Sequence, residues 1–316
     1  MISGHEVHYN PPTFRSKLLF DQIVLTKDYQ LIDFGRGRKL ERFDNKLLDR
    51  PCPAADGLTP ALRAEWRHAS HRFVDKIWME LARDGVEFTT DDERDNWVFR
   101  WNSVSMKLHA SPFGHVGVFP EQVENWDWIT QIGTHRRNWR STGSKVTALN
   151  LFAYTGGSTL ALASCGFEVT HVDASKPSVL WAKRNAAQSN ADQLPIRWIV
   201  DDARDFVLRE IRRKQQYDFI VLDPPAFGHG ANGKRWEIER DLPGLMDGCR
   251  QLLSESPIAV LLTGHSPIDS MEYGPLDKPT FTRLSDCFRS LHAKRSTLTD
   301  VSGRELDCGY LFRWTH

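Results

Sequence analysis

The residues best suited to chemistry stand at the ends of four apolar runs in the second half of the chain. The first run ends in Asn150-Leu-Phe-Ala-Tyr-Thr-Gly-Gly-Ser158 and leads directly into a predicted helix. Glycine lets a backbone approach a ligand closely, and the first turn of a helix offers free amide donors. The loop lacks the G-x-G-x-x-G spacing that admits a pyrophosphate, so it favours a cofactor without phosphates. The expected cofactor contacts in this loop are Asn150, Phe152, Tyr154, Thr155 and Gly156.

The next two runs each end in a carboxylate. Asp173 can accept hydrogen bonds from both hydroxyls of a ribose, or it can simply cap the helix that follows. Asp202 can accept a hydrogen bond from an adenine amino group; an N-cap explains it equally well, and the two roles are compatible. An adenosine would fit both carboxylates. The further cofactor contacts expected beside them are Ala174, Ser175 and Ala203.

The fourth run ends in Asp223-Pro-Pro-Ala-Phe227, which we call the Asp-Pro-Pro loop. Consecutive prolines fix the backbone and remove two amide donors, which leaves carbonyl oxygens and a carboxylate as acceptors. Phe227 could stack on a planar base, although a rigid turn with a core phenylalanine is the alternative. We predict catalytic roles for Asp223, Pro224, Pro225 and Phe227, and a second role for Asp223 at the cofactor.

Apolar strands and helices must alternate after residue 146 to position these loops. Continuous apolar strands separated by helices predict a parallel, doubly wound α/β sheet that binds ligands at the carboxyl ends of its strands. Two last strand-like runs, 295–300 and 308–314, predict a terminal antiparallel hairpin. The expected strands before it are 146–152, 168–174, 196–202, 217–223 and 258–264, and the expected helices are 157–165, 176–190, 203–214 and 236–254.

The first half of the sequence has a different pattern. Residues 29–50 predict a small antiparallel sheet turned at a Gly-Arg-Gly sequence, and apolar residues at largely helical spacing predict a helix over 62–81. Two strands are expected at 97–101 and 105–110. We therefore divide the chain into an N-terminal extension (1–21), a small α+β domain (22–111), a connecting segment that borders the cofactor site (112–145) and a catalytic domain (146–316).

Net charge, cysteine content and the distribution of apolar residues narrow the class of protein. The formal net charge is zero, so any nucleic acid must be held by local patches. Five cysteines without a close pair fit neither a disulfide framework nor a zinc site, and they suit a reducing cytoplasm. The sequence shows no export signal and no apolar stretch long enough for a membrane helix. We expect no metal and no membrane, and oligomeric state is not predicted.

The four loop sequences NLFAYTGGS, HVDAS, VDDA and LDPPAFG resemble the ribosomal RNA large-subunit methyltransferase family, which modifies cytosine or guanine of 23S RNA. The resemblance covers about residues 22–316. It implies a Rossmann-like class I methyltransferase sheet, S-adenosyl-L-methionine as the cofactor, RNA as the partner, and a small domain that helps to position RNA. FGHVGVFPEQ is similar to the family's segment bordering the cofactor pocket, so Phe119 and Gln122 are carried over as cofactor contacts.

The sequence departs from the resembled family in two places. Family members often begin with an extra RNA-binding domain, for which residues 1–21 are too few. Methylation of cytosine carbon-5 requires a cysteine thiolate, which the family's cytosine enzymes carry just after the fifth strand, where this chain reads Leu262-Thr-Gly-His-Ser-Pro267. We therefore favour a ring nitrogen such as guanine nitrogen-7, whose lone pair needs only alignment with the sulfonium methyl group. His265 could contact the substrate or serve a structural role.

Two basic clusters could bind RNA phosphates, although most charge runs are simply solvated. Arg137, in the second cluster, is the expected substrate contact. Three other functions stay open: a small-molecule or protein methyltransferase, an NAD-dependent oxidoreductase, and a non-catalytic RNA-binding protein. The first cluster is Arg36, Arg38, Lys39 and Arg42, and the second is His135, Arg136, Arg137, Trp139 and Arg140.

Overall fold

The computed structural model describes residues 28–81, 97–135, 145–229, 234–265 and 274–316. Its larger unit contains a seven-stranded sheet of order β10-β9-β8-β11-β14-β16-β15. The first five of these strands are parallel, and β16 and β15 are antiparallel to their neighbours, so the predicted parallel sheet with a terminal hairpin is confirmed. The strands are β8 (Thr147–Leu151), β9 (Glu168–Asp173), β10 (Ile196–Val200), β11 (Phe219–Leu222), β14 (Ala259–Gly264), β15 (Ser290–Thr299) and β16 (Glu305–Thr315).

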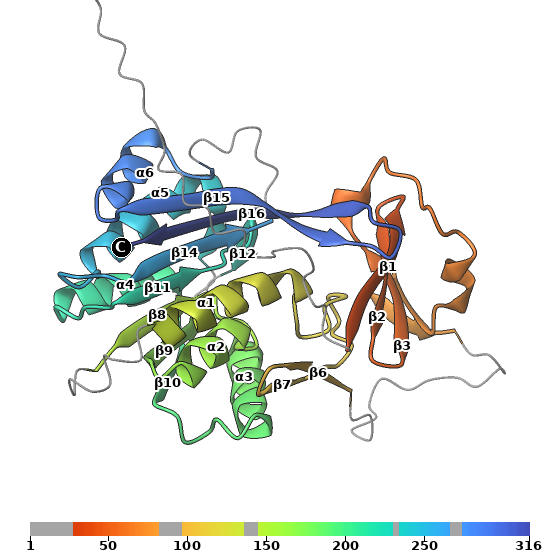
Figure 1. Cartoon of the computed structure of the whole chain (residues 1–316), viewed down its shortest axis with the longest axis horizontal. Helices are drawn as coiled ribbons and strands as arrows, with labels where there is room; N and C mark the ends of the chain where they lie inside the picture. The colour runs from red at the N-terminus through yellow and green to blue at the C-terminus, as the bar shows by residue number, and fades with distance from the viewer. Residues whose placement is uncertain (1–27, 82–96, 136–144, 230–233, 266–273) are drawn as a thin grey trace, which may run out of the picture.

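Helices cover both faces of this sheet (Figure 1). Side chains of β11 alternate between two cores: Phe219 and Val221 pack with α2 residues, whereas Ile220 and Leu222 pack with α4 and α5 residues. Burial on both faces explains the continuous apolar runs that predicted these strands. The helices are α1 (Val123–His135), α2 (Gly157–Ser164), α3 (Lys176–Gln188), α4 (Ala203–Arg212), α5 (Ile238–Gln251) and α6 (Lys278–Ser285). None of these described helices is long and apolar enough to cross a membrane.

The smaller unit is a five-stranded sheet of order β1-β2-β3-β4-β5. The antiparallel sheet predicted over 29–50 is confirmed, and Arg36 and Gly37 form its first turn with positive φ angles. Short 3-10 helices follow at Pro53–Ala55 (η1) and Glu65–His68 (η2). The strands are β1 (Tyr29–Gly35), β2 (Arg38–Phe43), β3 (Lys46–Pro51), β4 (His71–Val74) and β5 (Ile77–Glu80).

The helix predicted over 62–81 is wrong, because most of that stretch forms η2 and the hairpin β4–β5. Asp75 and Lys76 both have positive φ angles, of 49° and 67°, as a two-residue hairpin turn requires. Burial along β4 alternates with period two, since His71 and Phe73 are buried and their neighbours are half-buried. Among the described residues the small sheet therefore carries no α-helix, and the small unit is a β domain, not α+β.

The hairpin of β6 (Val98–Trp101) and β7 (Val104–Lys107) confirms the two strands predicted there. It packs on helix α3 of the larger unit, where Trp181 Nε1 donates to the Lys107 carbonyl at 2.8 Å. The Lys107 amide donates to Asn185 Oδ1 at 2.9 Å. Beyond this hairpin, η3 (Pro120–Gln122) and helix α1 lie within the segment expected to connect the two domains, and α1 was not predicted.

The long hairpin β15–β16 reaches from the large sheet to the small one (Figure 1). Near its tip, Arg304 pairs with the buried carboxylate of Asp33 and donates to the Thr59 carbonyl at 2.9 Å. Its guanidinium group also lies 4.3 Å from the centre of the Phe34 ring. Asp33 accepts further hydrogen bonds from the Leu62 amide and from Trp66 Nε1. One ion pair thus joins the hairpin tip to the small sheet.

We predict that Arg304→Ala destabilises the protein by roughly 1.5–3 kcal/mol, because the buried Asp33 carboxylate loses a charged donor. Lys294→Ala on the same hairpin is the matched control, since its partly exposed pair with Glu124 should be worth less than about 1 kcal/mol. Urea unfolding of both variants measures the difference. Equal losses in the two variants would contradict the proposed importance of this contact.

Candidate active site

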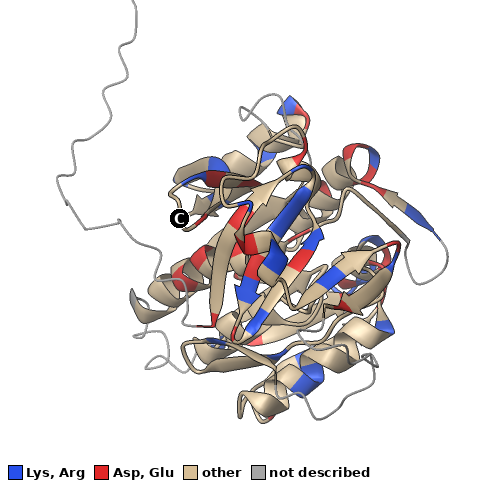
Figure 2. Cartoon of the chain, turned by 90° about the vertical axis from the view of Figure 1, so that its right-hand side faces the viewer, with Lys and Arg blue, Asp and Glu red and all other residues tan. Residues whose placement is uncertain are grey.

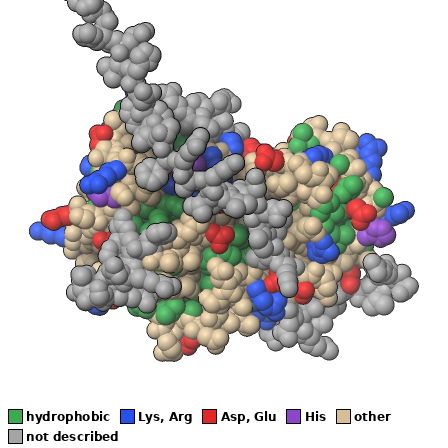
Figure 3. All heavy atoms as spheres, in the orientation of Figure 1, with side chains coloured by type: hydrophobic (Ala, Val, Ile, Leu, Met, Phe, Trp, Pro, Cys, Tyr) green, Lys and Arg blue, Asp and Glu red, His purple; other side chains and the backbone are tan. Residues whose placement is uncertain are grey.

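The loops that follow β8, β9, β10 and β11 surround one crevice of about 300 Å³. This volume is at the lower end of the roughly 300–1,000 Å³ found for small-molecule sites. Hydrophobic and acidic side chains lie close together near the middle of the molecule in Figure 3. The lining residues are His115, Phe119, Phe152, Tyr154, Val172, Asp173, Ala174, Ser175, Asp201, Asp202, Ala203, Asp223, Pro224, Pro225, Gly228, Trp236 and His265.

Most of the predicted site residues border this crevice, and the others divide into three groups. Gln122, Asn150, Thr155 and Gly156 line a smaller recess beside it. Phe227 does not line the crevice and is 75% exposed, so it is not the core residue that we considered as an alternative. Arg137 lies outside the described residues. What each of these residues binds stays a prediction.

The first loop is a tight turn with unusual backbone geometry. Phe152, Tyr154 and Gly156 have φ angles of 54°, 47° and 91°, and Gly156 is the N-cap of α2. Such conformations in residues other than glycine cost about 1–3 kcal/mol each and are common at functional sites. Thr155 Oγ1 donates to the Gly117 carbonyl at 2.6 Å, and Asn185 Nδ2 donates to the Thr155 carbonyl at 2.9 Å. The loop is therefore held in place before any ligand binds.

Asn150 lies beneath this loop in a buried polar chain. Its Nδ2 donates to Thr159 Oγ1 at 2.9 Å, and Thr159 Oγ1 lies 2.9 Å from Nδ1 of His171. Burial lowers the pKa of His171 to about 3, so this imidazole is neutral. Asn150 thus ties the end of β8 to helix α2.

Asp173 is oriented by two backbone amides. Its Oδ2 accepts from Tyr154 N and its Oδ1 accepts from Ser175 N, both at 2.8 Å. Burial raises the pKa of Asp173, and the two amides oppose this rise. Helix α3 is capped by Ser175, which accepts from Ser178 N, so capping by Asp173 is excluded. The remaining lone pairs of the Asp173 carboxylate can accept hydrogen bonds from a ligand.

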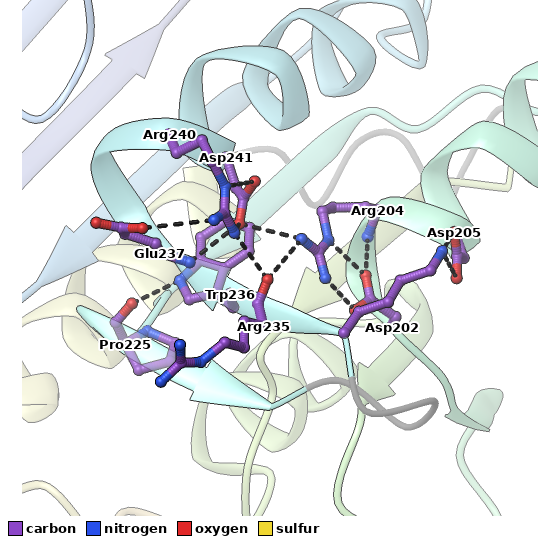
Figure 4. A network of polar contacts seen from close by, with 10 residues as sticks. Asp202, Arg204, Asp205, Pro225, Arg235, Trp236, Glu237, Arg240 and Asp241 are labelled. Atoms are coloured by element: carbon purple, nitrogen blue, oxygen red, sulfur yellow. Dashed lines mark hydrogen bonds and ion pairs between the residues drawn. The ribbon is translucent and has the colours of Figure 1, made fainter.

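Asp202 is the N-cap of α4, as one of our two interpretations expected. Its Oδ1 accepts from Arg204 N at 2.9 Å and from Arg204 Nε at 3.0 Å, and its Oδ2 accepts from Arg204 Nη2 at 2.7 Å (Figure 4). Burial raises the pKa of Asp202, but the hydrogen bonds from Arg204 outweigh burial and lower it overall. Contact with an adenine stays a prediction for this residue.

A short hairpin that the sequence did not predict holds the Asp-Pro-Pro loop. It consists of β12 (Phe227–His229) and β13 (Arg235–Glu237). Trp236 Nε1 donates to the Pro225 carbonyl at 2.7 Å (Figure 4). The centre of the Trp236 ring lies 4.9 Å from that of Phe152. Arg204 Nη1 also donates to the Arg235 carbonyl at 3.2 Å. The Pro225 carbonyl, one of the loop carbonyls expected to accept from a ligand, therefore already accepts from Trp236. The Trp236 side chain lines the crevice.

Asp223 is half-buried, lines the crevice and is fixed by two side chains. Its Oδ1 accepts from Thr263 Oγ1 at 2.8 Å, and its Oδ2 accepts from Gln122 Nε2 at 3.2 Å. Gln122 is itself held by Asn125, whose Nδ2 donates to Gln122 Oε1 at 2.7 Å. Burial raises the pKa of Asp223, while the charge of His265 and the hydrogen bond from Thr263 oppose the rise. Gln122 thus orients the Asp223 carboxylate in this structure.

A group of aromatic rings lines the crevice together with these polar side chains. The Phe119 ring lies 5.6 Å from Tyr154 and 5.8 Å from His265 between ring centres. His115 lies 5.4 Å from Phe119, and burial together with the charges of Arg50 and Lys39 lowers its pKa to about 4. An aromatic wall in a crevice that also holds carboxylates suits a cationic or planar ligand.

The cysteines do not offer a thiolate to this site. Cys249 is buried in α5, and burial raises its pKa to about 12. Burial likewise raises the pKa of Cys308. Among the described residues, no group of three or more His, Cys, Asp or Glu side chains could hold a metal ion.

The sheet order, the antiparallel last strands and the acidic loops at one sheet edge define the class I methyltransferase architecture. The SAM Dependent Methyltransferase from Agrobacterium tumefaciens is 31% identical, with a TM-score of 0.78, and the match covers 92% of this chain and 91% of that one. The chain therefore belongs to the S-adenosylmethionine-dependent methyltransferases. A putative methyltransferase from Streptococcus mutans, 16% identical with a TM-score of 0.64 over 92% of this chain and 76% of that one, shares the fold. No family model matches the chain.

Curated relatives match part of the chain. The Ribosomal RNA large subunit methyltransferase K/L of Hahella chejuensis is 29% identical over 176 residues, which are 54% of this chain and 22% of that protein. The Ribosomal RNA large subunit methyltransferase K of Neisseria meningitidis is 31% identical over 132 residues, which are 39% of this chain and 36% of that protein. The matched part thus spans between about a fifth and about a third of these relatives' length.

We predict that Asp173→Ala weakens S-adenosylhomocysteine binding by roughly 1.5–3 kcal/mol for each lost hydrogen bond to the ribose. Because burial raises the pKa of Asp173, wild-type affinity should also fall as the pH drops through that pKa and the carboxylate becomes protonated. Titration calorimetry measures both effects. The exposed Asp192→Ala is the control, and an unchanged affinity in Asp173→Ala would show that the ribose assignment is wrong.

Proposed function

We propose that this methyltransferase transfers the methyl group of S-adenosyl-L-methionine to a base nitrogen of RNA, with guanine of ribosomal RNA as the favoured target. One observation carries the proposal: the Asp-Pro-Pro loop presents a half-buried Asp223 carboxylate, held by two hydrogen bonds, to a crevice that is also lined by aromatic rings. The names of the curated relatives support RNA as the substrate. The scattered cysteines suit the cytoplasm as the place of action.

The cofactor would lie along the strand ends. Asp173 would accept from the ribose hydroxyls, and the adenine would lie near Phe152, Ala203 and Asp202. Trp236, which sequence reasoning missed, adds an aromatic face to this end of the crevice. Phe119, Tyr154 and the first loop would border the methionine part. In this arrangement the sulfonium group faces the Asp-Pro-Pro loop.

The reaction would be a direct in-line displacement. The lone pair of the base nitrogen attacks the methyl carbon, the carbon–sulfur bond breaks, and its electron pair stays on sulfur as the neutral thioether of S-adenosylhomocysteine. Alignment of the reactants alone can contribute roughly 7–11 kcal/mol, so a ring nitrogen needs no general base. Asp223 would orient the base through its N–H groups and stabilise the positive charge that appears on the ring. Phe227, exposed on β12, would stack on the target base or its neighbour.

Two of the four cations in the first basic cluster already have carboxylate partners. Arg38 pairs with Asp49, and Lys39 pairs with the buried Glu41. Lys and Arg alternate with Asp and Glu across the small sheet in Figure 2. Phosphate contacts by the second cluster stay a prediction, since its residues 136–140 lie outside the described part of the chain.

The alternative functions require different residues in the crevice or give different products. An NAD-dependent oxidoreductase would need a pyrophosphate-binding loop, which the first loop does not provide, and NADH titration tests it directly. Carbon-5 methylation of cytosine would need a thiolate, whereas burial keeps Cys249 and Cys308 protonated. A small-molecule or protein substrate would be methylated without RNA. A non-catalytic RNA-binding protein would transfer no methyl group at all.

We predict that Asp223→Ala abolishes methyl transfer to RNA from cells that lack this protein, because the base loses its orienting acceptor. Transfer from labelled cofactor measures the rate, and mass spectrometry of the nucleosides identifies the product. Asp247→Ala, which removes a partly exposed carboxylate of α5 outside the crevice, should keep the wild-type rate. Full activity of Asp223→Ala on RNA would refute the proposed role of the loop.

A further inference from the structure

A buried glutamate that the proposed reaction does not use lies beside His265. Glu121 belongs to η3, and its Oε1 lies 3.1 Å from His265 Nε2. The Glu121 side chain is 5% exposed and that of His265 is 49% exposed, so the histidine is anchored at its inner end and reaches the solvent side. The second carboxylate oxygen of Glu121 is buried, and the described part of the chain supplies no hydrogen-bond partner for it.

Resting on the function proposed above, we propose that Glu121 is a positioning residue that holds His265 by Nε2, so that the other ring nitrogen donates a hydrogen bond to an acceptor atom of the target base. His265 lines the crevice together with Asp223 and Pro225. The anchored histidine is thereby a specificity-determining residue for the base.

The charges around His265 favour a ring that carries both protons. Burial lowers the pKa of His265, but the hydrogen bond and charge of Glu121 and the charge of Asp223 raise it overall, against an opposing effect of Lys39. The neighbouring His115 is neutral at physiological pH. For Glu121, burial raises the pKa, but His265 and Lys39 outweigh burial and lower it. The carboxylate is therefore ionised, and it stabilises an imidazolium.

A hydrogen-bond donor on His265 complements the hydrogen-bond acceptor that Asp223 already supplies. Both oxygens of the Asp223 carboxylate accept hydrogen bonds in this structure, so this group can recognise N–H groups of a base. An imidazolium adds a donor for a carbonyl oxygen or an unprotonated ring nitrogen. The two together match a base edge with an acceptor beside an N–H group, as guanine presents at its carbonyl oxygen and N1. The nitrogen that receives the methyl group needs neither contact.

The pH dependence separates this role from general base catalysis. A donor histidine must be protonated, so kcat/KM for RNA is full below its raised pKa and falls as the pH rises through it. A general base must be neutral, so its rate would rise through the same pKa. The direction of the profile therefore distinguishes the two roles.

The test combines Glu121→Gln with two other variants. NMR titration of 13C-histidine-labelled protein bound to S-adenosylhomocysteine follows His265, assigned by its absence in His265→Gln. We expect Glu121→Gln to lower the pKa of His265, to move the fall in kcat/KM to lower pH, and to reduce kcat/KM at neutral pH roughly ten- to hundredfold, as expected for a lost charged hydrogen bond. His265→Gln keeps an amide donor and should retain transfer without the falling limb. Glu255→Gln, which changes an exposed carboxylate that does not line the crevice, should match wild type.

An unchanged pKa of His265 in Glu121→Gln would overturn the proposal, as would a wild-type rate that rises through that pKa. If the wild-type protein transfers no methyl group to RNA, the proposed function fails, and the NMR titration alone decides whether Glu121 anchors His265.

Discussion

The convergence of parallel strands at one edge of a sheet is the constraint on which the rest of this structure depends. Parallel strands all end on the same side of the sheet. The loops after β8, β9, β10 and β11 therefore lie close together in space although they are far apart in the sequence. The loop after β8 contributes a turn with positive φ angles, and each of the other three loops contributes a carboxylate. A cofactor and a planar substrate can then lie side by side in one crevice.

The carboxylates in this crevice are kept in place by hydrogen bonds from the protein itself. Asp173 is held by two amides, Asp202 by Arg204, and Asp223 by Gln122 and Thr263. Such prior orientation lowers the entropic cost of binding and of alignment for reaction. The small β domain takes part indirectly, because Lys39 and Arg50 of its strands influence the pKa of His115 at the crevice wall.

The sequence predicted the large sheet well, because strands buried on both faces are apolar without interruption and their loops carry recognisable residues. The prediction failed over 62–81, where the apolar residues fit helical spacing. The alternating burial along β4, in which His71 and Phe73 are buried, was not recognised because a two-residue turn ends it. The strands β12 and β13 have three residues each, too few for any periodicity, so Trp236 was missed. The partners of Gln122 and Glu121 come from distant parts of the chain, and sequence spacing carries no signal of such contacts.

A crystal structure with bound S-adenosylhomocysteine tests the central claim most directly. We expect the ribose hydroxyls within hydrogen-bonding distance of the Asp173 carboxylate and the sulfur atom facing Asp223 across the crevice. A crevice that stays empty at saturating ligand, or a ligand whose ribose lies away from Asp173, would contradict the account.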